Sequence, residues 1–117
     1  MRKDILMLVL GIFIGFTVAN IYFVVSGNYP SSPFEEIIPY NFTTGSIAVI
    51  LGLVISGALV VYLKKEIESL SLKNISRIST GFFFFGVLGF FRNAIYPAAI
   101  VCLILTCVFT YLGFLKK

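Results

Sequence analysis

Histidine is absent from this 117-residue chain, and charged residues make up only 12% of it. Without histidine, the chain lacks the commonest transition-metal ligand and the commonest general base. A soluble domain carries about twice this share of charged residues, whereas the mean hydropathy here is +1.04. Four apolar runs cover most of the chain, at about residues 5–25, 46–63, 78–96 and 98–115. Each can cross a bilayer as a helix of about 20 residues. The sequence therefore predicts an all-α fold, in which residues 1–117 form a single transmembrane bundle of four helices.

Acidic side chains are absent from all four predicted spans. The five acids lie in tails and loops, at Asp4, Glu35, Glu36, Glu66 and Glu68. Proton-coupled transport usually requires a titratable group inside the membrane, so that mechanism is disfavoured. Catalysis by a carboxylate pair, a metal or a Ser–His system has no candidate residues either. We therefore predict a protein that is not an enzyme and that needs no cofactor and no metal.

Lysine and arginine are missing from residues 26–45, the predicted loop between the first two spans. Eight of the nine cations lie in the two tails and in the basic loop 64–77, and Arg92 is the exception. The positive-inside rule assigns such cations to the cytoplasm, so both termini are predicted to be cytoplasmic and loop 26–45 to be outside. The net charge of +4 then reflects topology and anionic lipid contact rather than nucleic-acid binding. We expect a multi-pass protein of a bacterial or archaeal cytoplasmic membrane, although the rule also fits eukaryotic membranes.

The third span is the hardest to delimit. If it begins at Ile78 and stops before Arg92, it holds about 14 residues and is about 21 Å long, short of the hydrocarbon thickness of about 30 Å. We therefore expect it to run on to Tyr96 and to stop at Pro97, because the residue before proline is biased away from helix. Loop 64–77 ends in alternating polar and apolar residues, which we interpret as a segment lying at the interface.

Small residues recur four apart in the spans, which places each set on one helix face. In lipid, such faces let helices approach closely and gain dispersion contacts. Packing of this kind joins either helices of one protomer or helices of different chains, and the sequence leaves both open. The predicted helix-packing interface consists of Gly11, Gly15 and Ala19 in the first span and Ala48, Gly52 and Ser56 in the second.

Arg92 is the one ionisable residue predicted to touch the hydrocarbon. A charge there faces a partner, a cavity or a lipid headgroup, and a guanidinium suits bidentate capture of phosphate or carboxylate. Asn93 adjoins it, and Asn20 is predicted at a similar depth in the first span. These three residues form the candidate site for an anionic substrate or a lipid headgroup, with Glu35 or Glu36 as the alternative partner of Arg92.

Two known families of small four-span proteins carry functional residues that this chain lacks. The small multidrug-resistance transporters carry a Glu in the first helix, where residues 12–16 here have none. The fluoride channels carry a Thr/Ser-rich break in the third helix, where residues 82–85 here are four phenylalanines. In topology and length the chain resembles small flippase-type proteins that handle polyprenyl-linked sugars. No internal repeat is evident.

Two functions follow from these patterns. The leading prediction is a small non-enzymatic membrane protein that acts by helix packing, as a subunit or as an accessory or assembly factor of a membrane complex. Its partners would be membrane lipids and other transmembrane subunits. The alternative is a small oligomeric transporter, channel or flippase for an anionic or lipid-linked substrate. That alternative requires a homo-oligomer or a partner, because four short helices can hardly enclose a pore.

Overall fold

The computed structural model describes residues 3–27, 41–69, 71–92 and 95–115, and this part of the chain is helical apart from single residues at the helix ends. It contains no strand among those residues. The elements, in chain order, are α1 (Lys3–Ser26), α2 (Phe42–Tyr62), α3 (Lys64–Glu68), α4 (Leu72–Arg92), α5 (Tyr96–Thr110) and the π-helical turn η1 (Tyr111–Leu115).

Four of these helices are long and apolar enough to cross a membrane. They are α1, α2, α4, and α5 continued through η1, and they contain 20 to 24 residues each. At a rise of about 1.5 Å per residue, even the shortest reaches about 30 Å, which matches the hydrocarbon thickness. The all-helical fold class predicted from the sequence is therefore confirmed, together with the number of helices long enough to span.

Helix α2 begins earlier than the expected residue 46, because Asn41 and Thr44 form a capping box. The Asn41 side chain accepts a hydrogen bond from the Thr44 amide at 3.0 Å, and the Thr44 hydroxyl accepts one from the Asn41 amide at 2.9 Å. This pair satisfies two amide groups that a helix start leaves unpaired. At the other end, Leu63 has a ψ of 18° and separates α2 from the short helix α3.

The predicted bounds of the third span, 78–96, need correction. Helix α4 begins at Leu72, where the Ser71 hydroxyl accepts a hydrogen bond from the Asn74 amide at 3.1 Å, and it ends at Arg92. Its 21 residues span about 31 Å, so the length argument for continuing to Tyr96 disappears. Tyr96 instead opens α5, with Pro97 in its first turn, where proline is tolerated. The predicted loop 64–77 is thus mostly α3 and the start of α4.

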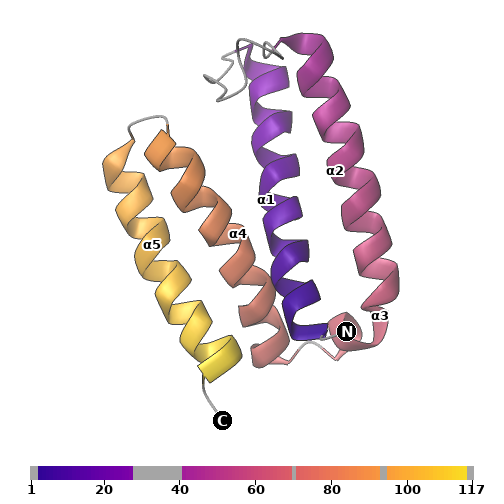
Figure 1. The fold of residues 1–117 in the computed structure, drawn as a ribbon, viewed down its shortest axis with the longest axis vertical. Helices are drawn as coiled ribbons and strands as arrows, with labels where there is room; N and C mark the ends of the chain where they lie inside the picture. The colour runs from indigo at the N-terminus through magenta and orange to yellow at the C-terminus, as the bar shows by residue number, and fades with distance from the viewer. Residues whose placement is uncertain (1–2, 28–40, 70, 93–94, 116–117) are drawn as a thin grey trace.

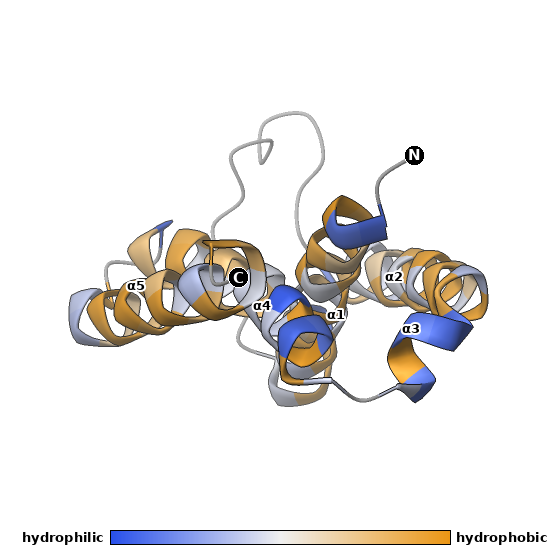
Figure 2. Ribbon diagram, turned by 90° about the horizontal axis from the view of Figure 1, so that it is seen from below, coloured by the Kyte–Doolittle hydropathy of each residue, from blue (hydrophilic) through white to orange (hydrophobic). Residues whose placement is uncertain are grey.

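The four long helices lie in a single row rather than around a common axis (Figures 1 and 2). Their order is α2, α1, α4, α5, and each packs on its neighbour in the row. The overall extents of 45 × 32 × 23 Å describe a slab. The start of α1, the end of α2, α3 and the start of α4 meet at one end, which carries Lys3, Lys64, Lys65, Lys73 and Arg77 (Figure 2). We call this the basic end.

The largest buried side chains gather near the basic end. Met7 and Leu10 of α1 and Leu63 beside α3 are 0–1% exposed, and they are surrounded by Leu6, Ile14, Leu59, Ile67 and Ile78. Ile67 of α3 completes this core, so the short helix is attached to the long ones by apolar contact. Elsewhere the four long helices bury few of their residues, between 11% and 28% of an 18-residue stretch in each.

Helices α1 and α4 approach most closely at two glycines. A Cβ on Gly11 would overlap the carbonyl oxygen of Ile78 and lie 2.9 Å from the amide nitrogen of Phe82. A Cβ on Gly81 would overlap the carbonyl oxygen of Leu8 and lie 2.9 Å from the amide nitrogen of Ile12. Ile78 and Phe82 are three residues before Gly81 and one residue after it. Leu8 and Ile12 stand in the same relation to Gly11. The two contacts are reciprocal, as expected for two parallel helices related by a two-fold axis.

The same relation extends to the whole molecule. Hairpin α1–α2 lies beside hairpin α4–α5, with α1 and α4 adjacent at the centre of the row (Figure 1). A shift of 70 residues aligns most of the burial pattern of α1 with that of α4, except that Met7, Gly15, Thr17 and Asn20 are buried where their counterparts are not. A shift of 50 aligns α2 with α5. Residues 51–59 and 101–109 have the same pattern of buried and exposed positions throughout. The chain is therefore an internal repeat of a helical hairpin.

Candidate functional site

The predicted helix-packing residues lie at two junctions of the row. Gly11 and Gly15 face α4, where a Cβ on Gly15 would lie 3.2 Å from the Phe85 ring. Gly52 faces α1, where a Cβ would overlap the Thr17 hydroxyl. Ala19, Ala48 and Ser56 are half-buried. The three glycines therefore serve packing within one chain.

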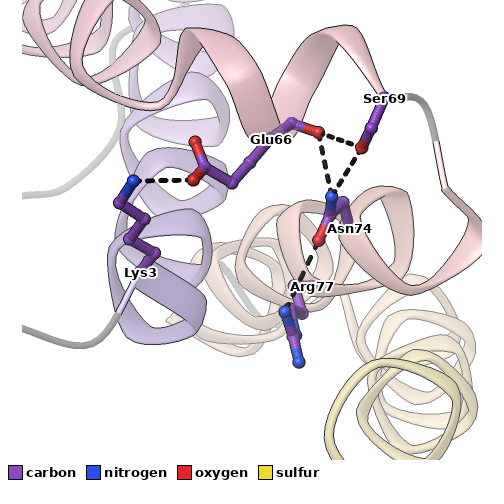
Figure 3. Close-up of polar contacts among 5 residues, drawn as sticks. All are labelled: Lys3, Glu66, Ser69, Asn74 and Arg77. Atoms are coloured by element: carbon purple, nitrogen blue, oxygen red, sulfur yellow. Dashed lines mark hydrogen bonds and ion pairs between the residues drawn. The ribbon is translucent and has the colours of Figure 1, made fainter.

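The basic end holds a polar network that joins the two hairpins (Figure 3). Lys3 of α1 donates a hydrogen bond to Glu66 of α3 at 2.7 Å. Asn74 of α4 donates to the Glu66 backbone carbonyl at 2.8 Å and to the Ser69 hydroxyl at 3.0 Å. The Ser69 hydroxyl in turn donates to the Glu66 carbonyl at 2.7 Å. One short helix is thereby fixed to both α1 and α4.

Arg77 extends this network to the end of the chain. Its Nε donates to the carbonyl oxygen of Gly113 in η1 at 2.8 Å, and its Nη1 donates to Asn74 at 3.4 Å. The guanidinium also lies 5.7 Å from the centroid of the Phe114 ring, a cation–π distance. Gly113 is needed here because a Cβ would lie 3.0 Å from the Arg77 backbone nitrogen. Sequence reasoning missed these residues, since polar side chains in a basic loop are normally solvated.

Removing Asn74 is expected to weaken the attachment of α3. Asn74→Ala eliminates two donated hydrogen bonds and the bond from Arg77, a loss of about 1–2 kcal/mol. Equilibrium unfolding in mixed micelles measures the change in free energy, and Lys73→Ala, which truncates the exposed neighbour, is the matched control. Equal stability of the two variants would show that the network contributes nothing.

The Lys3–Glu66 ion pair makes the stability of the fold depend on pH. The hydrogen bond from Lys3 holds the pKa of Glu66 below its ordinary value of 4.5. A carboxyl whose folded pKa is depressed stabilises the fold above its unfolded pKa, and this contribution is lost as the pH falls through the folded value. We therefore expect stability to decline below about pH 4.5.

Glu66→Gln should flatten that decline in a series of unfolding measurements at different pH. The control is Glu68→Gln, which removes a carboxylate from the same helix without touching Lys3. If both variants decline with acid as the wild type does, the Lys3–Glu66 pair is not the cause.

The predicted polar cluster is not assembled among the described residues. Asn20 is 6% exposed and donates to the Phe16 carbonyl of its own helix at 2.7 Å. Arg92 is exposed at the end of α4 and makes no hydrogen bond or ion pair with another described residue. Asn93, Glu35 and Glu36 lie outside the described residues. Of the predicted cluster, Arg92 lies at the end of the row opposite to the basic end, and the grouping with Asn93 stays a prediction.

The described residues hold no group of three His, Cys, Asp or Glu side chains that could bind a metal ion. Both cysteines are free, with Cys102 buried against Gly86 of α4 and Cys107 exposed on the other side of α5. The hydroxyls of Thr17, Thr80, Thr106 and Thr110 each donate to a carbonyl of their own helix, four residues earlier. They therefore form no polar path from one helix to the next.

By class, the chain is an all-helical protein with four candidate membrane spans, as in a multi-pass membrane protein. No protein family, curated protein or solved structure matches it.

Proposed function

We propose that the chain is a small non-enzymatic membrane protein that packs against other transmembrane helices, as a subunit or accessory factor of a membrane complex. The observation that carries this proposal is the free edge of α2. In an 18-residue stretch of this helix only 11% of the residues are buried, because α1 is its one long neighbour. The basic end would then face the cytoplasm, as the positive-inside rule requires.

The free edge of α2 presents one glycine, Gly57, between two exposed valines. Val54, Gly57 and Val61 share one face, with Val54 63% and Val61 75% exposed, and Ala58 beside them is exposed as well. No described atom lies within 4 Å of a Cβ built on Gly57. Since small side chains are what transmembrane helices use for close approach, this face suits a partner helix.

A transport path through one chain finds less support. Transporters built from parallel repeats place the substrate between the repeats. Here the repeats meet at Gly11 and Gly81 with their backbones in contact, so no substrate fits at the axis. The alternative transporter, channel or flippase would need a path between chains, and hence an oligomer.

Native mass spectrometry of the full-length protein, gently extracted from its own membrane, tests the proposal. We expect a complex of fixed stoichiometry with other chains, which Gly57→Leu disrupts while the fold is retained. Gly89→Leu is the control, because it makes the same change on α4. A Cβ built on Gly89 likewise has no described atom within 4 Å outside its chain neighbours and the nearby backbone of its own helix. A symmetric homo-oligomer that survives Gly57→Leu would favour the transporter instead.

A further inference from the structure

An apolar groove runs between α4 and α5 at the end opposite to the basic end. Its volume is about 330 Å³, and it is lined by Val87, Phe91, Tyr96, Ala99, Ile100 and Leu103. The rings of Phe91 and Tyr96 meet edge-on, with centroids 5.6 Å apart. Apart from the tyrosine hydroxyl, the lining offers no polar group, so its occupant must be apolar where it touches the groove.

The residue that follows the groove-lining Phe91 is positively charged. Arg92 follows Phe91 as the last residue of α4, is exposed, and has no partner among the described residues. With α4 about 31 Å long, Arg92 reaches the headgroup level when Leu72 lies at the opposite boundary of the hydrocarbon. Tyr96 lies at the same end, and tyrosine is enriched at that depth. The groove therefore leads from the hydrocarbon to a cation at the membrane surface.

The first hairpin carries different residues at the corresponding positions. Counting back 50 residues, the counterpart of Ala99 is Val49, and counting back 70 residues, the counterpart of Arg92 is Tyr22. The counterpart of Val87 is Thr17, which packs against Gly52. The cation at position 92 and the small side chain of Ala99 therefore have no equivalent in the first hairpin.

We propose that this groove is a binding site for an anionic phospholipid of the leaflet at the Arg92 end. One acyl chain lies against Val87, Ala99 and Leu103, and the lipid phosphate accepts charge-assisted hydrogen bonds from Arg92. A flexible chain suits the occupant because the groove is apolar and bounded by side chains of two helices. An anionic headgroup suits it because a guanidinium binds phosphate in bidentate fashion, and its charge complements that of Arg92.

Native mass spectrometry of the full-length protein released from nanodiscs tests this site. The nanodiscs contain equal amounts of phosphatidylglycerol and phosphatidylcholine. We expect the wild type to retain phosphatidylglycerol preferentially, and Arg92→Gln to reduce that preference roughly tenfold, as the loss of a hydrogen bond to a charged group implies. Arg92→Lys keeps the charge and should retain most of the preference for phosphatidylglycerol.

The groove itself is tested by a matched pair of substitutions. Ile100→Trp narrows it, whereas Ile50→Trp makes the same change at the equivalent position of the first repeat; the two isoleucines are 57% and 60% exposed. We expect only Ile100→Trp to reduce retention of both lipids. The proposal is overturned if Arg92→Gln keeps the wild-type preference, or if the two tryptophan variants retain lipid equally.

Discussion

Gly11→Ala and Gly81→Ala are each expected to destabilise the protein more than any other single added methyl group. The added Cβ would overlap a backbone carbonyl oxygen of the facing helix, that of Ile78 or Leu8 respectively. A backbone atom cannot rotate away as a side chain can, so the two helices must separate along their contact. Overpacking of this kind costs about 1–3 kcal/mol or more, and here it acts at the junction of the two repeats.

Unfolding of the purified protein in mixed micelles, followed by far-UV circular dichroism, measures the loss. Gly57→Ala and Gly89→Ala are the controls, because no described atom lies within 4 Å of their Cβ positions. Alanine is favoured over glycine in a helix by about 0.5–1 kcal/mol, so the controls should be neutral or slightly stabilising. An equally small effect at Gly11 would mean that the helices do not touch there.

The double variant gives a further check. Once Gly11→Ala has separated the helices, the second methyl group meets more room, because both glycines lie at one crossing. The losses should therefore be clearly less than additive, which is the behaviour of residues in contact. Additive losses would indicate two independent sites and would contradict the reciprocal geometry.

Hydropathy alone predicted the four long helices, since each run is nearly free of charge. It misplaced the start of α4 because Asn74 and Arg77 look like loop residues. Their partners are Glu66, Ser69 and Gly113, and contacts as distant as 36 residues leave no periodic signal. The hydrophobic pattern could thus find the spans but not the polar contacts that join them.

The repeat was hidden for a different reason. Lys3, Ile5 and Gly11 recur 70 residues later as Lys73, Ile75 and Gly81, but the positions between them have diverged from leucine to serine and threonine. In lipid, burial is decided by helix contact rather than by polarity, so equivalent positions need not share hydropathy.

Gly52→Ala is expected to be the next most damaging methyl addition. Its Cβ would overlap the Thr17 hydroxyl, and it would lie 3.2 Å from the Thr17 Cβ and 3.4 Å from the Phe16 ring. Thr17 is 5% exposed, and its hydroxyl donates to the Phe13 carbonyl at 2.8 Å, so it has little space to move. A loss of about 1–3 kcal/mol is expected, measured by the same unfolding experiment.

A second substitution at position 17 distinguishes lack of space from loss of the hydrogen bond. Thr17→Ala removes the overlapping atom and should recover at least half of the loss caused by Gly52→Ala. Thr17→Val removes the same hydrogen bond but keeps a methyl group in place of the hydroxyl, so it should recover nothing. Because Thr17 and Gly52 touch, the coupling between them should appear in a double-mutant cycle. Equal recovery by alanine and valine would assign the effect to the hydrogen bond and would contradict close packing of α1 on α2.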